Sequence, residues 1–364
     1  MAFSFGFSGD DIDAESSGDV QAGAAAAAAA AAQTGDEQQQ PALMEARALD
    51  VDELLSTLPS KISYSSIEIV SPKERRLLIP RRELFDIRMQ LMAEDGGGDD
   101  TDTTLAGIDS SDIKTNVYEG GFKSWECSVD LAKLLLDWGP RKDIDDLCRV
   151  DHVVELTLSL PVQLGCGTAL PTLTLFQYAL REALPIYFTL ADYNASVLRL
   201  VTLPNLLLTF ARVSSLIPNT ADPGDLDITP SLLAAFRAAL SSVGMTLTLI
   251  AGAWSPRLVD LVPVTSGGTS DMGTLVLAAE TIYSPAALER FADTLVPILK
   301  RCRMGKAMLG AKRIYFGVGG SVGAFKEAAS AMGAVAYDID NSGVELGRGG
   351  QGGVERVLME VQMM

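Results

Sequence analysis

The chain has 364 residues, 48% of them hydrophobic, and a formal net charge of −18. This length and hydrophobic share are enough for one medium α/β domain with appendages, since domains usually contain about 100–200 residues. The negative charge argues against tight binding to a phosphate backbone, so we expect no sequence-specific contact with nucleic acid. An acidic surface suits a basic protein as partner instead.

Cysteine and histidine usage excludes further classes of protein. The four cysteines show no Cys-x-x-Cys spacing and the only histidine is His152, so the sequence predicts no zinc site of the usual kind and no other metal. His152 precedes a predicted strand and is interpreted as structural. No stretch resembles a signal peptide or a membrane span, so we expect the chain in the cytoplasm, with the nucleus as a further location.

Residues 1–50 are predicted to be a disordered tail. They include a polyalanine run at 24–32, and the first 60 residues carry 11 acidic side chains against Arg47 alone. Such a composition cannot bury enough apolar surface to fold by itself. The alternating Phe3, Phe5 and Phe7 are either a short docking motif or a stray apolar end.

Residues 51–116 are predicted to form an N-terminal extension and a linker. Apolar residues predict extended structure at 62–70 and an amphipathic helix at 84–92. A glycine-rich acidic stretch at 94–102 predicts the linker. Between strand and helix lies a basic cluster that we interpret as a solvated face, with nuclear import or an RNA contact as the alternative. The cluster consists of Lys73, Arg75, Arg76, Arg81 and Arg82.

Residues 117–364 alternate between strand-like and helix-like stretches. Strands are predicted at 153–158, 186–190, 246–250, 274–278, 306–309, 334–338 and 357–361, and helices at 128–138, 172–184, 195–200, 286–299 and 323–332. This order predicts an α/β fold with a mostly parallel sheet flanked by helices. The proline-containing segment at 201–244 predicts an insertion. In such sheets the ligand lies at the carboxyl ends of the strands.

A glycine-rich turn follows the first of these strands. Gly167 precedes Asp192 by 25 residues, close to the spacing of about 20 between a glycine turn and a ribose-binding acid. Leu170 stands where the dinucleotide fingerprint has its third glycine, and no Gly-Lys-Ser/Thr follows. A nucleoside without a pyrophosphate, such as S-adenosylmethionine, is therefore favoured over NAD and ATP. The alternative is a purely structural turn.

Seven sequence blocks stand in a recognisable order. They are VYEGGFKSWEC (117–127), LGCGT (164–168), ADYN (191–194), VTLPN (201–205), GAWS (252–255), AETIYSP (279–285) and IYFGVGG (314–320). Together they resemble the protein-histidine methyltransferases of the seven-β-strand class, fungal and animal enzymes that methylate a ribosomal protein. The resemblance implies a Rossmann-like, seven-stranded class I methyltransferase fold over residues 117–364. It also implies S-adenosylmethionine as cofactor and one histidine of the third protein of the large ribosomal subunit as substrate.

The resemblance also implies roles for individual residues. Asp192 would hold the ribose hydroxyls, and Glu280, at the tip of the fourth strand, would be the catalytic residue. Judged from the residues alone, Glu280 could equally cap the next helix, and Trp125 could be a core aromatic. The residues implied in cofactor binding are Lys123, Trp125, Glu126, Cys127, Gly165, Cys166, Gly167, Asp192, Tyr193, Asn194, Ala253, Trp254 and Ala279.

The chain departs from the family pattern at three places. Residues 157–164 separate the end of the first strand from the glycines, which puts Gln163 at the position of an acid and leaves the register of that strand open. Ala253 replaces an acid near the adenine, and Gly273 stands where members often carry Asp. The alternatives are a protein-lysine methyltransferase of the same fold and a non-catalytic ribosome-assembly protein.

Overall fold

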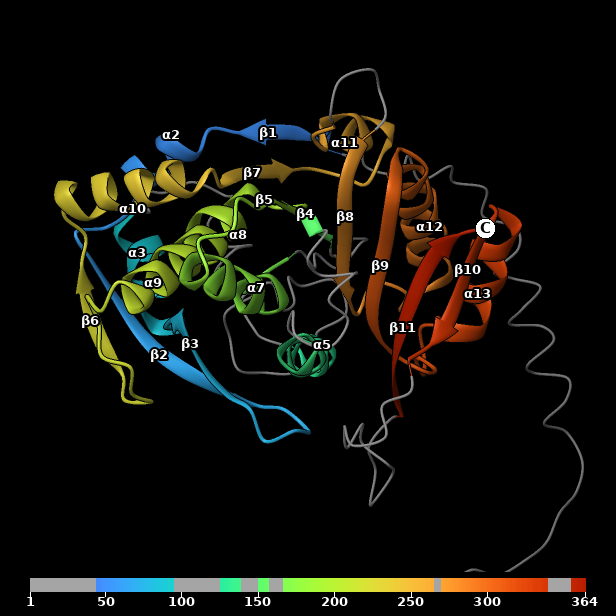
Figure 1. Cartoon of the computed structure of the whole chain (residues 1–364), viewed down its shortest axis with the longest axis horizontal. Helices are drawn as coiled ribbons and strands as arrows, with labels where there is room; N and C mark the ends of the chain where they lie inside the picture. Colours follow the sequence, from blue (N-terminus) through green and yellow to red (C-terminus); the bar gives the residue numbers. More distant parts are fainter. Residues whose placement is uncertain (1–43, 95–124, 139–149, 157–165, 265–269, 340–354) are drawn as a thin grey trace, which may run out of the picture. The chain divides into compact units, whose positions relative to one another are not determined.

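An eight-stranded, mostly parallel sheet forms the centre of the fold (Figure 1). The computed structural model describes residues 44–94, 125–138, 150–156, 166–264, 270–339 and 355–364. The strand order is β1-β7-β5-β4-β8-β9-β11-β10, in which the five strands from β7 to β9 run parallel. The strands are β1 (Arg47–Leu49), β4 (Val150–Leu156), β5 (Tyr187–Asp192), β7 (Thr246–Ala251), β8 (Ser270–Ala279), β9 (Cys302–Lys312), β10 (Ala334–Asp338) and β11 (Arg356–Met363).

This sheet confirms the predicted Rossmann-like class, with one addition. Seven strands correspond to the predicted ones, and β1 adds an eighth by pairing antiparallel with β7. A Cβ on Gly252 would lie 2.5 Å from the Cα of Ala46, so only glycine lets the chain before β1 approach so closely. The folded region therefore begins before residue 50, inside the predicted tail. Residues 1–43 lie outside the described residues.

Helices cover both faces of the sheet, and the strands between them are buried on both sides. Leu275 and Leu277 of β8 belong to one hydrophobic cluster, whereas Val276 and Ala278 belong to the other. Because side chains alternate across a strand, a continuous apolar run supplies both clusters. The first cluster includes α5 (Glu126–Asp137), α7 (Leu170–Arg181) and α9 (Leu203–Val213), and the second α11 (Pro256–Leu261), α12 (Pro285–Lys300) and α13 (Val322–Ala331).

The N-terminal extension folds together with part of the predicted insertion. Strands β3 (Arg76–Arg82), β2 (Lys61–Val70) and β6 (Gly224–Asp227) form a second, three-stranded sheet. β6 lies within the segment 201–244 that the sequence predicted as an insertion. From the same segment, α9 packs against β3 of the extension. Residues 43–364 accordingly form one compact unit, so the extension is not a separate domain. The remaining helices here are α2 (Val51–Ser56), α3 (Leu84–Glu94) and α10 (Pro230–Val243).

A π-helical turn interrupts the helix predicted at 195–200. The helical run consists of α8 (Ala195–Val197), the π-helix η1 (Leu198–Thr202) and α9. By length and composition alone it could cross a membrane, but 83% of its most apolar window is buried inside the fold, as in a core helix. π-Helical turns are rare and often lie at functional sites.

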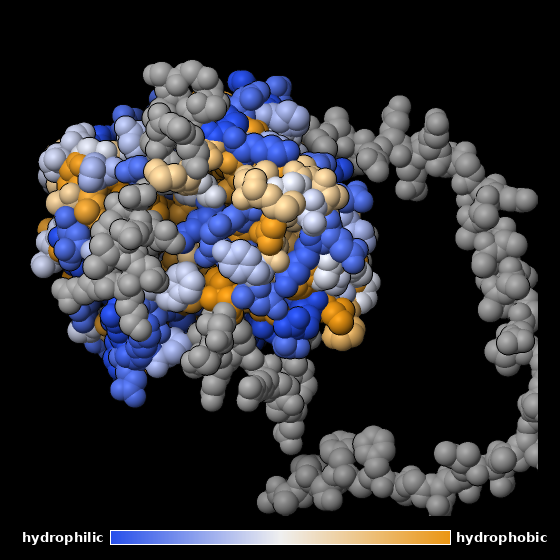
Figure 2. Space-filling view, turned by 45° about the vertical axis from the view of Figure 1, so that its right-hand side comes forward, coloured by the Kyte–Doolittle hydropathy of each residue, from blue (hydrophilic) through white to orange (hydrophobic). Residues whose placement is uncertain are grey.

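Exposed large hydrophobic side chains are spread over many of the described elements, with groups on α3 and in the loop after β9. On the face seen in Figure 2 they form scattered patches between hydrophilic ones. Phe85 and Met89 are exposed on α3, and Ile314, Phe316 and Val318 are exposed in the loop that follows β9. Single exposed apolar residues are ordinary on a protein surface, whereas a cluster on one loop suggests a contact surface.

Candidate functional site

The carboxyl ends of the parallel strands bring several predicted site residues to one edge of the sheet. Strand β5 ends at Asp192, β7 ends at Ala251, and β8 ends at Ala279, one residue before Glu280. Parallel neighbours place their carboxyl ends at the same edge, which is where α/β sheets bind ligands. Lys123 and Gly165 lie outside the described residues, so their roles stay predictions.

The glycine turn and Asp192 are in direct contact. The Gly167 amide donates to Asp192 Oδ2 at 3.2 Å, and the Asn194 amide donates to Oδ1 at 2.9 Å. Gly167 has a φ of +52°, a conformation that glycine adopts without strain. Asp192 is 1% exposed, and this burial raises its carboxyl pKa to about 7. The 25-residue spacing thus places a buried carboxylate against the turn, and the contact of Asp192 with a ribose stays a prediction.

Glu155, near the end of β4, contacts the helix that follows the glycine turn. Its Oε2 accepts a hydrogen bond from the Thr172 amide in the first turn of α7 at 3.0 Å. The end of β4 therefore contacts the helix that follows the glycines, whatever lies between them. Gln163, which the sequence put at the position of an acid in the family pattern, is outside the described residues. The sequence left open how the first strand is positioned relative to the glycines. In the structure Glu155 of this strand, β4, lies beside α7.

The burial of Glu155 predicts a pH-dependent stability. Burial raises its pKa from 4.5 to about 7. The folded state therefore binds this proton more tightly than the unfolded state, and the stability present below about pH 4.5 is lost as the pH rises to 7. Glu155→Gln keeps an oxygen for the Thr172 amide without that charge. As the pH rises from 5 to 8, the wild type should lose the stabilisation that the variant does not depend on. The difference in free energy of unfolding, variant minus wild type, should therefore increase by about 3 kcal/mol over this range.

Thermal melts of both proteins at each pH, without cofactor, would measure this difference. Taking the difference between the two proteins cancels the contributions of all other titrating groups. A gap between the two melting temperatures that does not change with pH would contradict the prediction.

Side chains from η1 and α9 hold the carbonyl groups of the glycine turn. Thr202 Oγ1 donates to the Gly167 carbonyl at 2.7 Å, and Asn205 Nδ2 donates to the Thr168 carbonyl at 3.2 Å. Asn205 Oδ1 in turn accepts from the backbone amide of Arg82 at 2.8 Å. The last residue of β3 therefore sets the orientation of the side chain that braces the turn.

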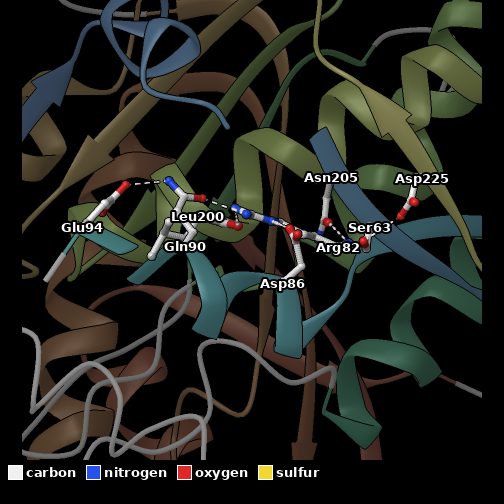
Figure 3. Close-up of polar contacts among 8 residues, drawn as sticks. All are labelled: Ser63, Arg82, Asp86, Gln90, Glu94, Leu200, Asn205 and Asp225. Carbon is white, nitrogen blue, oxygen red and sulfur yellow. Dashed lines mark hydrogen bonds and ion pairs between the residues drawn. The ribbon is translucent and has the colours of Figure 1, made fainter. Parts of the chain in front are cut away.

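Arg82 is the buried centre of a polar network (Figure 3). Its Nε donates to Asp86 Oδ2 at 2.6 Å, its Nη2 to Gln90 Oε1 at 2.7 Å, and its Nη1 to the Leu200 carbonyl at 3.1 Å. Burial lowers the pKa of this guanidinium, and the Asp86 carboxylate opposes that shift. The interpretation of Arg82 as part of a solvated basic face is therefore wrong. Among the rest of that cluster, Lys73, Arg75 and Arg76 are exposed.

Asn205 connects the Arg82 amide to the Thr168 carbonyl of the glycine turn. We therefore expect Asn205→Asp to weaken binding of S-adenosylmethionine, the cofactor that the sequence predicts. Aspartate can still accept from the Arg82 amide but cannot donate to the Thr168 carbonyl, so two oxygens would face each other across the turn. We expect the dissociation constant to rise about tenfold, equivalent to about 1.4 kcal/mol.

Ser66→Ala is the matched control for Asn205→Asp. Ser66 Oγ accepts from Arg212 Nη2 at 2.8 Å, a contact between the same two elements, the extension and α9, that does not involve the turn. Calorimetry should find its cofactor affinity unchanged. Equal affinity losses in both variants would mean that the extension acts on the fold in general rather than on the turn.

Glu280 occupies a strained and buried position at the end of β8. Its φ is +57°, which non-glycine residues rarely adopt and which clusters at functional sites. Its amide donates to the Gly310 carbonyl at 2.9 Å. The cap of α12 is Ser284, whose Oγ accepts from the Ala287 amide at 3.2 Å. The alternative that Glu280 caps this helix is therefore wrong.

The two oxygens of the Glu280 carboxylate have different partners. The Tyr315 hydroxyl donates to Oε2 at 2.6 Å and itself accepts from the Lys312 amide at 3.1 Å. Oε1 is buried without a hydrogen bond among the described residues, and Lys312 Nζ lies 4.0 Å from it. Burial and then the neighbouring Glu280 raise the pKa of the Tyr315 hydroxyl, so this tyrosine stays protonated and donates. The Cys127 thiol also interacts with this carboxylate. Oε1, whose ion-pair partner is Lys312, is the oxygen that remains to accept a hydrogen bond from a further donor.

The residues before and within α5 differ in their surroundings. Cys127 is buried next to Glu280, and burial followed by Glu280 raises its thiol pKa. A Cβ on Gly310 would lie 2.7 Å from the Cys127 carbonyl, so this approach of α5 to β9 needs glycine. Glu126 is largely exposed and pairs with Arg356 at 3.5 Å, while Trp125 is half-buried at the start of the helix.

The predicted adenine-side residues are buried near β1. The Ala253 amide donates to the Met44 carbonyl at 2.8 Å, and the Trp254 ring packs against Phe291 with centroids 5.1 Å apart. Trp254 thus belongs to the second hydrophobic cluster. Tyr193 and Asn194 are half-buried directly after β5. Their contacts with a cofactor stay predictions.

Two further expectations concern the opposite edge of the sheet. Gly273, where family members often carry Asp, pairs with Val150 at the beginning of β4, so this departure does not touch the site. His152 lies at the same end, with Nε2 2.8 Å from Thr189 Oγ1. Burial lowers its pKa to about 4, as expected for a structural histidine.

The curated proteins that are similar in sequence to this chain include several that share one name. Histidine protein methyltransferase 1 of Saccharomyces cerevisiae is 35% identical over 356 residues, which cover 90% of each chain. The chain belongs to the histidine protein methyltransferase 1 family. The family member of Schizosaccharomyces pombe is 35% identical over 278 residues, 76% of this chain and 75% of that protein. The rat homolog is 30% identical over 221 residues, 60% of this chain and 51% of that protein.

Family membership rests on these relatives and confirms the resemblance seen in the sequence blocks. No protein-family model matches the chain. Similar solved structures include the PH0226 protein from Pyrococcus horikoshii, with a TM-score of 0.33, 9% identity, and coverage of 63% of this chain and 88% of that chain. The CcbJ methyltransferase from Streptomyces caelestis has a TM-score of 0.32 and 8% identity, covering 68% and 93%. Such low scores transfer no site residue.

Several residues of the site were not assigned a role from the sequence. Tyr315 and the pair Thr202 and Asn205 lie within blocks that carried the resemblance, but their partners are distant in the chain. From the sequence, Tyr315 could be expected to be partly buried, and the hydroxyl of a buried tyrosine needs a hydrogen-bond partner. Nothing in the sequence identified that partner as Glu280.

Proposed function

We propose that this chain transfers a methyl group from S-adenosylmethionine to a histidine side chain of a protein substrate. The observation that carries the proposal is the Glu280 carboxylate at the ligand-binding edge. Tyr315 holds its Oε2, and the buried Oε1 has no hydrogen bond among the described residues. This oxygen can accept the N–H of an imidazole ring, which leaves the other ring nitrogen free to act as nucleophile.

The residues at this edge fit S-adenosylmethionine. Burial holds the pKa of the Asp192 carboxyl near 7, and hydrogen-bond donors to this group favour its charged form. The two hydroxyls of a ribose can supply such donors. Gly167 lets the backbone pass close to a nucleoside. Cys127, which interacts with Glu280, is one of the residues expected at the methionine end of the cofactor. When bound, the cofactor supplies a methyl group attached to a positively charged sulfur.

The chain's own part in the reaction is chiefly positioning. A free imidazole has a pKa of about 6.5 and is mostly neutral at cytosolic pH, so little proton abstraction is needed. Glu280 would fix the tautomer and orientation of the ring, with Tyr315 fixing Glu280. Holding the reacting atoms about 3–3.5 Å apart removes much of the entropic barrier. The carboxylate would also stabilise the positive charge that the ring acquires on methylation, like the orienting acid of a triad.

We further propose the third protein of the large ribosomal subunit as substrate. The family resemblance of the sequence blocks supports this substrate, and the net charge of −18 suits attraction of a basic protein. The test is incubation of the purified chain with that recombinant protein and tritiated S-adenosylmethionine, followed by hydrolysis and amino-acid analysis. Methylhistidine is the expected product.

Other outcomes of this assay would overturn the proposal in distinguishable ways. Methyllysine, with a rate that rises steeply at alkaline pH because lysine must lose a proton, would make the chain a lysine methyltransferase. Binding of the ribosomal protein without binding of S-adenosylmethionine would make it a non-catalytic assembly protein.

A further inference from the structure

A loop beside Glu280 carries three exposed apolar side chains. Residues 313–320 follow β9, and within them Ile314, Phe316 and Val318 are 47%, 77% and 51% exposed. Tyr315, between the first two, is buried with its hydroxyl on Glu280. We call the three exposed side chains the apolar lip. These residues belong to the sequence block IYFGVGG (314–320). Of this block, only Tyr315 has a role in the proposed mechanism.

The backbone of this loop is anchored at several points. The Tyr315 amide donates to the Gly320 carbonyl at 2.9 Å, and the Gly319 amide donates back to the Tyr315 carbonyl at 3.1 Å. The Gly320 amide donates to the Tyr283 carbonyl at 2.9 Å. A Cβ on Gly320 would lie 2.0 Å from the Ile282 carbonyl oxygen, so the loop sits directly on the segment after Glu280. A surface ordered in advance loses little entropy when a partner binds.

The apolar lip is continuous with the candidate active site. Ile314 and Phe316 flank the residue that bonds to the candidate catalytic carboxylate, and neighbouring Cα atoms are about 3.8 Å apart. The apolar lip therefore lies within reach of the residues next to a histidine that is held at Glu280.

Ion pairs lie beside the apolar lip, starting from Arg313, the residue before Ile314. Arg313 lies 2.9 Å from Glu355 and 3.7 Å from Asp338, and Lys326 lies 2.8 Å from Asp338. These cations are engaged with acids on the same molecule, so the loop presents mainly apolar surface to a partner. Apolar and aromatic side chains with charged groups beside them are a usual composition of a protein interface.

We propose that the apolar lip is the docking surface for the substrate protein and receives an apolar or aromatic side chain close in sequence to the target histidine. This inference rests on the proposed function and adds a basis for substrate choice. The net charge of −18 attracts a basic protein at long range but is screened by salt and does not discriminate one histidine from another. Burial of an apolar side chain acts only at contact and therefore can.

The test is a comparison of Phe316→Ser, alone and combined with Val318→Ser, with the wild type. Initial rates are measured against the concentration of the third large-subunit ribosomal protein at saturating S-adenosylmethionine. We expect KM to rise about tenfold for the single variant and further for the double variant. The expected kcat stays within twofold, with the cofactor dissociation constant unchanged. Phe85→Ser is the matched control, since Phe85 is 60% exposed on α3 of the extension.

A second arm changes the substrate. Replacing by serine the apolar residues within about five positions of the methylated histidine should raise KM similarly, and the two changes should not be additive if they remove one contact. An unchanged KM in both Phe316 variants overturns the docking surface alone. A wild-type dimer that Phe316→Ser dissociates overturns it in favour of a second copy of the chain. No methyl transfer by the wild type to any protein overturns the proposed function, and the docking surface with it.

Discussion

Replacing Glu280 by glutamine is expected to lower the rate constant of methyl transfer to a protein histidine by about 100-fold or more, within the range usual for a positioned acid or base. Glutamine keeps the size of the side chain and can still accept from the Tyr315 hydroxyl. It lacks the charge that would stabilise the methylated ring, and its amide can turn a donor toward the imidazole. Single-turnover transfer from tritiated S-adenosylmethionine measures this rate constant without contributions from product release.

Two comparisons make the Glu280 result interpretable. Glu289→Gln, the same substitution at an exposed position of α12, should retain the wild-type rate. Calorimetry of Glu280→Gln should give a cofactor affinity within twofold of the wild type, because no cofactor role is proposed for this carboxylate. Transfer at the wild-type rate by Glu280→Gln would remove Glu280 from the mechanism.

Replacing Asp192 by asparagine is expected to weaken binding of S-adenosylmethionine by about 10- to 100-fold, the loss of one or two hydrogen bonds to a charged group. The wild type should also bind more weakly as the pH falls from 8 to 6. In the free chain burial holds the Asp192 pKa near 7, and hydroxyl donors of the ligand favour the charged form, so binding releases a proton. The affinity of Asp192→Asn should not change over this range.

Calorimetry in buffers of different ionisation enthalpy measures the proton release at Asp192 directly. Asp260→Asn, at an exposed position of α11, is the control for the loss of one negative charge and should bind like the wild type. A melting temperature of Asp192→Asn close to that of the wild type would show that the fold is retained. Equal affinity and an equal pH dependence in Asp192→Asn and the wild type would exclude this carboxylate from the cofactor site.

The central sheet could be predicted because its information is local. The run at Leu275–Ala278 is apolar at every position, which is the pattern of a strand buried on both faces, and its neighbours in the sheet show similar runs. Strand β1 could not be predicted in the same way. Its three residues follow an acidic, alanine-rich tail, and it pairs with β7 about 200 residues later, where Gly252 leaves room for the chain.

Arg82 shows why the surroundings of a charged residue are hard to predict. It stands in a basic stretch whose other members include exposed side chains, and its composition gives no reason to separate it from them. Only the packing of α3 and η1 around β3 supplies the acceptors, Asp86, Gln90 and the Leu200 carbonyl, that make its burial tolerable.

The sequence by itself determined the α/β class, the family and the two ends of the candidate site, since the glycine turn, Asp192 and Glu280 each lie at the end of an element with a local pattern. The tertiary structure decided how these parts act together. The contact of Glu155 with α7, the hold of Asn205 on the turn and the bond from Tyr315 to Glu280 join residues 17, 37 and 35 positions apart. Such contacts depend on which strands become neighbours in the sheet. That choice minimises the free energy of the whole chain, so it leaves no pattern in any one segment.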